Sequence, residues 1–155
     1  PFTIRDPQAP EGTRTQVWHY PSRAECLVCH SRAAGFVLGI QTEQLHRLHD
    51  YGEGPVSQID RYRDWGLFSK PPKPTAELPA LADPYDPSQP LEARARAYFH
   101  VNCSNCHQAA GGGNSQIDLL VTTKSADMKL VDAKPNHGNL GIDEGRLIAP
   151  GAPER

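Results

Sequence analysis

Long hydrophobic runs are missing from this sequence of 155 residues. No apolar stretch approaches the roughly 18–20 residues that a membrane-spanning helix needs. Only 37% of the residues are apolar, below the roughly 45–50% of a typical globular domain, although that reference also counts glycine. Such a chain can bury only a modest core by itself. We therefore expect a large, flat, apolar cofactor to fill part of the interior.

A marked excess of one charge sign is also missing, since 16 basic residues stand against 18 acidic ones. This balance gives no reason to expect nucleic acid or an anionic membrane surface as a partner. The opening residues, PFTIRDPQAPEG, lack the basic start and the apolar segment of a secretion signal. Because the first residue is proline and not methionine, we expect that a leader or a preceding segment has been removed.

Proline and glycine are abundant, with 15 and 13 copies, and they limit regular secondary structure. The remaining patterns predict a short strand at TQVWHY (15–20) and helices over residues 42–51, 56–67 and 91–102. The sequence AAGGGNS (109–115) has the composition of a flexible loop. The fold class predicted from these segments is mainly α with extensive coil.

All four cysteines belong to two copies of the motif Cys-x-x-Cys-His, at residues 26–30 and 103–107. This is the attachment signature of c-type haem. The two thiols of each motif add to the two vinyl groups of one porphyrin, and the adjacent histidine ligates the iron. Cys26 and Cys29 would hold one haem c with His30 as its proximal ligand. The second haem c would be held by Cys103 and Cys106, with His107 below its iron.

Paired cysteines have three other common uses in proteins. Four cysteines at these spacings could form one zinc site, but this leaves the histidine after each pair unexplained. A thioredoxin-like redox pair needs a βαβ context that the sequence does not show. Disulfides within the motifs would close very small, strained loops. Two complete copies of the haem signature favour the two-haem interpretation.

Seven prolines in residues 69–90 separate the two motifs. We predict a first haem-binding half at residues 1–68, a linker or strap at 69–90, and a second haem-binding half at 91–155, which together can still form one compact domain. This arrangement predicts a small cytochrome c-like dihaem protein organised around two covalent haems.

Each iron also needs a distal ligand or keeps an open position. The single methionine, Met128, can serve at most one haem, and its surroundings favour a packing role. Histidine is in surplus, and the distal candidates are His19, His46, His49, His100 and His137. His46 and His49 would share a helical face if residues 42–51 form a helix. His137 is the candidate for the second haem, because it follows His107 in a loop-like stretch.

Bis-histidine ligation has a functional consequence. Imidazole ligands give lower potentials than a thioether ligand, and six-coordinate iron leaves no site for a small substrate. The sequence therefore predicts electron transfer and not catalysis. A dihaem peroxidase-like enzyme with one open iron is the alternative in the enzyme class.

Three stretches resemble a family of dihaem c-type cytochrome domains, often appended to large secreted proteins that include quinoprotein-dehydrogenase-like ones. They are YPSRAECLVCHSRAAGFVLGIQTEQLHR, NCSNCHQAAGGG and HGNLGIDEGRLIAPGAPER. The resemblance implies electron transfer in the periplasm or outside the cell, and it allows a second alternative, the cytochrome domain of a secreted dehydrogenase. Members of that family continue into a Met-Pro-Pro ligand segment, which is absent before Arg155, so the second haem would take another ligand if this is the whole domain.

The partners predicted for such a protein are redox proteins, or further copies of the chain. Proline-rich ends normally fray unless something holds them. One hypothesis is therefore that the ends pack on neighbouring copies and form an extracellular haem filament.

Overall fold

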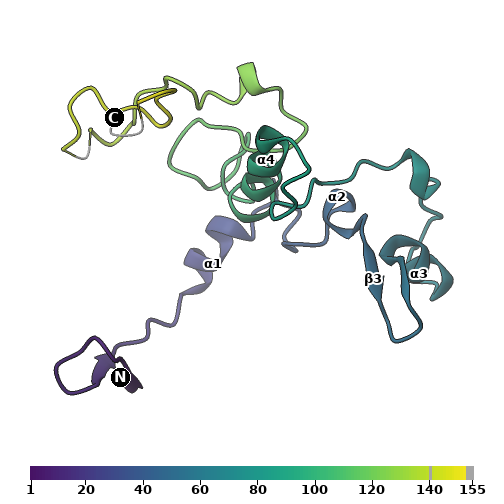
Figure 1. Ribbon diagram of the computed structural model, residues 1–155, viewed down its shortest axis with the longest axis horizontal. Coiled ribbons are helices and arrows are strands. Elements are labelled where there is room, and N and C mark those ends of the chain that lie inside the picture. Colours follow the sequence, from purple (N-terminus) through teal and green to yellow (C-terminus); the bar gives the residue numbers. More distant parts are fainter. Residues whose placement is uncertain (140, 153–155) are drawn as a thin grey trace.

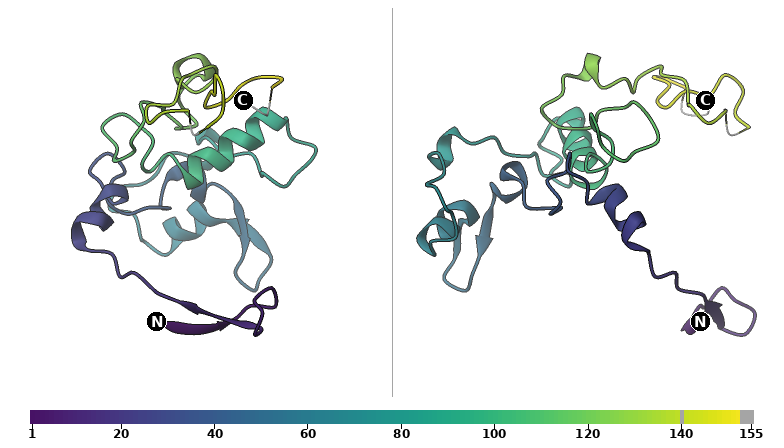
Figure 2. Two further views of the ribbon diagram at one scale, coloured as in Figure 1. Left: turned by 90° about the vertical axis from the view of Figure 1, so that its left-hand side faces the viewer. Right: turned by 180° about the vertical axis from the view of Figure 1, so that it is seen from behind.

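The computed structural model describes residues 1–139 and 141–152. Three arms leave the region around one central helix (Figures 1 and 2). Helical residues account for 24% of the structure and strand residues for 11%. The prediction of a mainly α, cytochrome c-like fold is therefore wrong, and the architecture is mixed and mostly irregular. The physical reason is that proline and positive-φ glycine interrupt the segments that carry helical patterns.

The N-terminal arm is a two-stranded antiparallel hairpin. Strands β1 (Phe2–Arg5) and β2 (Thr13–Gln16) pair with Phe2 opposite Gln16. An Asp6–Arg14 ion pair of 3.1 Å joins the turn to β2. Strand β2 therefore contains only the first two residues of the strand expected at residues 15–20. The hairpin lies apart from the rest of the chain at the end of an irregular connection (Figure 2).

Helix α1 (Arg23–Cys29) carries the first cysteine motif. A capping box starts it: the Ser22 hydroxyl accepts from the Glu25 backbone N–H, and the Glu25 carboxylate accepts from the Ser22 N–H at 2.7 Å. The helix ends at Cys29, and His30 is its C-cap. Both first-motif thiols therefore lie on the last turn of a short, well-started helix.

The helix expected over residues 42–51 is largely replaced by a hairpin. Helix α2 covers only Thr42–Leu45, and strand β3 (Leu48–Asp50) pairs with β4 (Pro55–Ser57). Asp50 Oδ1 accepts the backbone N–H groups of Gly52 and Gly54 at 2.7 and 3.0 Å. Both glycines have positive φ, so turn chemistry overrides the helical pattern at this point.

Helix α3 (Gln58–Asp64) is shorter than the helix predicted for residues 56–67. Val56 lies in β4, and the Ser57 hydroxyl caps α3 by accepting from the Asp60 N–H. An irregular segment with one 3₁₀ turn, η1 (Thr75–Glu77), leads from α3 to the central helix.

Helix α4 (Leu91–Asn102) confirms the predicted helix at these residues. It follows Pro90 directly and ends at the second motif, with Cys103 as its C-cap. Arg96 on α4 donates to the carbonyls of Val121 and Thr123. This contact holds the segment before the 3₁₀ turn η2 (Ser125–Asp127) against the helix.

Little apolar surface is buried. Among the described residues the buried apolar side chains are Ala34, Ile59, Ala97, Leu119 and Met128. The accessible surface is 11549 Å², against roughly 7,700 Å² for a compact monomer of 17.0 kDa. The burial of Met128 agrees with a packing role for that side chain. Within the described part of the chain, no helix has the length and apolar character needed to cross a membrane.

Ile59 on α3 is only 3% exposed. We expect Ile59→Ala to lower the free energy of unfolding of the haem-free chain by about 2 kcal/mol or more, because it loses buried apolar surface and leaves a cavity. Urea unfolding followed by circular dichroism measures this loss. Ile142→Ala is the matched control, because that side chain is 42% exposed and should change the value by less than about 0.5 kcal/mol. Equal losses for the two variants would contradict the placement of Ile59.

Candidate functional site

The two cysteine motifs, 77 residues apart in the chain, meet in space. The Cys106 thiol donates to Cys29 Sγ at 2.7 Å. Cys29 is placed by the end of α1, and Cys106 by a tight turn after α4 in which the His107 N–H donates to the Cys103 carbonyl at 2.9 Å. Both thiols of the pair are half-buried, whereas Cys26 is exposed. One predicted attachment residue of each motif is thus brought into contact with the other.

Three glycines after the second motif, Gly111–Gly113, form a packed loop that we call the glycine loop. A Cβ atom on Gly112 would lie 2.1 Å from the carbonyl oxygen of Val28, inside the first motif. A Cβ atom on Gly113 would lie 2.6 Å from His107 Nδ1, inside the second motif. The Gly113 N–H also donates to the Cys106 carbonyl at 2.9 Å. The flexible loop expected from composition is therefore a close contact that touches both motifs.

The histidines of the two motifs both use Nδ1 in a hydrogen bond. His30 Nδ1 lies 2.7 Å from the Phe36 carbonyl, which can only accept, so Nδ1 carries the proton and Nε2 keeps its lone pair. His107 Nδ1 lies 3.3 Å from the Ser115 hydroxyl, which can accept the same proton. This pattern orients an imidazole to ligate a metal through Nε2.

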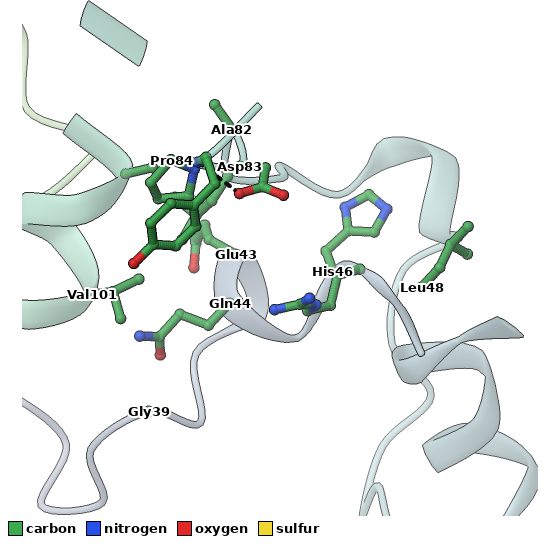
Figure 3. A pocket seen from close by; sticks show the side chains of 13 residues that line it. Gly39, Glu43, Gln44, His46, Leu48, Ala82, Asp83, Pro84 and Val101 are labelled. Carbon is green, nitrogen blue, oxygen red and sulfur yellow. Dashed lines mark hydrogen bonds between the residues drawn. The ribbon is translucent and has the colours of Figure 1, made fainter. Parts of the chain in front are cut away.

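His46 shows the same pattern among the distal candidates. As the C-cap of α2, it directs Nδ1 to the Pro79 carbonyl at 3.0 Å, and this leaves Nε2 with its lone pair. Its side chain lines a cavity of about 660 Å³ between α2, α4 and the segment 81–85 (Figure 3). No cysteine of either motif lines this cavity.

His100 is the most buried of the candidates, with 3% of its surface exposed. Its Nδ1 accepts the Val121 backbone N–H at 3.3 Å, which places the ring proton on Nε2. That buried Nε2 has no hydrogen-bond partner among the described residues. Burial lowers the pKa of His100 below its ordinary value of 6.5. A protonated Nε2 is not set up to ligate iron, and a structural role fits His100 better.

The other three candidates for a distal ligand are His19, His49 and His137. His19 Nε2 pairs with Glu25 Oε1 at 3.0 Å on the surface. His49 lies in β3 against the Tyr51 ring, so it does not share a helical face with His46, and that expectation is wrong. His137 is exposed in the irregular segment after residue 133.

The arrangement also bears on the zinc alternative. Among the described residues, which include all four cysteines, no group of three or more histidine, cysteine or acidic side chains is placed to hold a metal ion. Burial, and to a smaller extent the hydrogen bond to Cys29, raises the pKa of the Cys106 thiol to about 11. A zinc site needs deprotonated thiolates converging on one point, and the geometry here joins one thiol from each motif.

Sequence reasoning missed three groups of the site: the Phe36 carbonyl, the Ser115 hydroxyl and the glycine loop. The Phe36 carbonyl is presented by a backbone with φ 65°, for which the sequence gives no signal. The three consecutive glycines were a usable signal, because close approach of backbone to backbone requires the absence of Cβ.

The buried imidazole of His100 generates a pH prediction. Because its pKa is lowered on folding, the unfolded chain binds more protons just below pH 6.5, and stability is lost as the pH falls through that value. We expect His100→Gln to flatten the dependence of unfolding free energy on pH between about 7 and 5. Urea unfolding at several pH values measures it. His137→Gln is the exposed control and should keep the original slope; a loss of slope in the control alone would contradict the assignment.

No family model, no curated protein and no solved structure matches this chain.

Proposed function

We propose that this protein is a dihaem c-type cytochrome that transfers electrons outside the cytoplasm. The observation that carries the proposal is the meeting of two complete Cys-x-x-Cys-His motifs, through the Cys29–Cys106 contact of 2.7 Å. Motifs that share no surface would suit two separate carriers. Motifs in contact suit two redox centres that exchange electrons with each other.

The orientation of the motif histidines supports haem. A ligating imidazole normally donates its other ring N–H to a carbonyl, hydroxyl or carboxylate, which fixes the ring and strengthens the ligand. His30 and His107 both have such an acceptor at Nδ1. Neither hydrogen bond is required by the attachment signature itself, so the two features are independent.

Exposed apolar side chains around the first motif also support the proposal. Leu27 and Val28 lie between the two cysteines and are 49% and 46% exposed. Phe36, Val37 and Ile40 follow the motif and are each more than half exposed. An apolar surface of this kind typically marks a binding site. A porphyrin is large, flat and apolar, and it would cover these side chains.

When bound, haem supplies the one-electron chemistry, and its axial ligands and surroundings set the potential. The residues of this chain would hold two such groups: Cys26 and Cys29 would tether one and Cys103 and Cys106 the other, and His30 and His107 would each ligate one iron. We assign His46 as the favoured distal ligand, because its Nδ1 is already bonded to the Pro79 carbonyl and its Nε2 carries a lone pair. The proposed partners are redox proteins or further copies of the chain.

The full chain, produced in a host that attaches haem c, is expected to carry two haems per polypeptide. A pyridine-haemochrome assay together with intact mass measures this number. Replacing both cysteines of one motif by alanine should leave one haem, and Cys26→Ala/Cys29→Ala and Cys103→Ala/Cys106→Ala are matched controls for each other. A mass equal to that of the bare chain would refute the proposal. Peroxide turnover with a high-spin ferric band would favour the peroxidase-like alternative.

The assignment of His46 generates a separate expectation. His46→Ala should convert one low-spin haem to high spin in the low-temperature EPR spectrum, because it removes one of the two strong axial ligands. His19→Ala is the control, since the His19 Nε2 is engaged with Glu25, and its spectrum should match that of the parent. An unchanged spectrum for His46→Ala would transfer the distal role to another residue.

A further inference from the structure

Cys29 and Cys106 form a direct contact between the two motifs. The two sulfur atoms are 2.7 Å apart and come from different motifs. A disulfide requires about 2.05 Å, so a movement of less than an ångström would bring them to bonding distance. Of the four thiols, all within the described part of the chain, these are the two joined by a hydrogen bond. Both remain partly accessible to solvent reagents.

The glycine loop keeps this pair together from outside the motifs. The close approach of Gly112 to the Val28 carbonyl fixes the residue immediately before Cys29. The Gly113 N–H bonds to the carbonyl of Cys106 itself. The loop therefore contacts the backbone on both sides of the sulfur pair, and the pairing does not rest on the two side chains alone.

We propose that Cys29 and Cys106 form a disulfide in the haem-free chain, and that this single modification blocks haem attachment at both motifs until it is reduced. The bond takes one thiol from each motif. A bond within one motif would leave the other motif intact. The formation of the bond does not depend on the proposed function, whereas its effect on attachment does.

The oxidant is a low-molecular-weight disulfide such as oxidised glutathione. One protein thiolate attacks it, forms a mixed disulfide and releases one small thiol. The second protein thiol then loses its proton, attacks the protein sulfur of the mixed disulfide and releases the second small thiol. Two protein thiols are thereby oxidised, and one small disulfide is reduced to two thiols.

The test uses the full haem-free chain, purified in the reduced form and then incubated with oxidised glutathione. Peptide mapping by mass spectrometry without reduction is expected to find residues 29 and 106 in one linked pair. Linkage of Cys26 to Cys29, or of Cys103 to Cys106, as the main product would overturn the proposal. So would a product linked between chains.

Matched variants separate the contact from general thiol reactivity. Cys26→Ser/Cys103→Ser keeps the contacting pair and should oxidise at the parent rate. Cys29→Ser/Cys106→Ser keeps the other two thiols. Its intramolecular disulfide should form at least about tenfold more slowly, because these thiols lack the local concentration that contact provides. Gly112→Ala should also slow the reaction. Gly145→Ala is the control and should not slow it, because the nearest atoms to its added Cβ, at 3.2–3.4 Å, belong to Ile142 and Asn139 and not to either motif. Equal rates for the two cysteine variants would refute the role of the contact.

A haem arm distinguishes this inference from the proposed function. Haem is offered to the reduced chain and to the oxidised chain, and covalent attachment is measured by mass. Attachment to the reduced chain alone supports both proposals. Equal attachment to both forms overturns the blocking role. No attachment to either form, with the 29–106 link still mapped, counts against the proposed function and leaves the disulfide standing.

Discussion

The close approach of two chain segments that are far apart in the sequence is the constraint on which the site depends. Helix α1 contains both cysteines of the first motif and ends at Cys29, whereas the second motif begins at Cys103, directly after α4. The glycine loop then fits between Val28 and His107 because it has no side chains. Without this packing the two motifs would be independent attachment points on a loosely organised chain. With it they form one site, on which both the proposed electron exchange between centres and the proposed Cys29–Cys106 disulfide depend.

The shortage of a protein core follows from the same composition that allows the site. With few apolar residues and many prolines, the chain buries five apolar side chains among the described residues and leaves Leu27, Val28 and Phe36 about half exposed. In an ordinary domain such residues would pack against other side chains, since burying each of them contributes about 1.5–3 kcal/mol. Here they lie beside the first cysteine motif, to which we propose that a flat apolar group is attached. Composition, exposure and motif are consistent with one another under the haem proposal.

The sequence predicted some parts of the structure well and others poorly, for identifiable reasons. Helix α4 was predicted correctly because Pro90 and a run of good helix formers mark its start and length. The prediction of a helix over residues 42–51 was wrong because Asp50, Gly52 and Gly54 favour a hairpin turn. The spacing of apolar residues, on which the prediction was based, carries no information about this turn. The capping box of Ser22 and Glu25 was readable in advance and would have revealed α1. The hydrogen bond from His30 to the Phe36 carbonyl was not readable, because it depends on backbone geometry that only the folded chain defines.

Under the haem proposal, the sulfur pair requires that the haem-free and haem-loaded chains differ locally. At 2.7 Å the two sulfurs are closer than heavy atoms in van der Waals contact, which lie about 3.5–4.0 Å apart for carbon. From this distance two thiols can go on to form a disulfide, whereas two thioether sulfurs have no S–H bond to give up and must move apart. Attachment at both motifs would therefore open the contact by roughly an ångström, and the glycine loop is the element that must follow. Its lack of side chains allows the backbone to shift against Val28 and His107 at low cost, so the same three residues that hold the motifs together also let them separate.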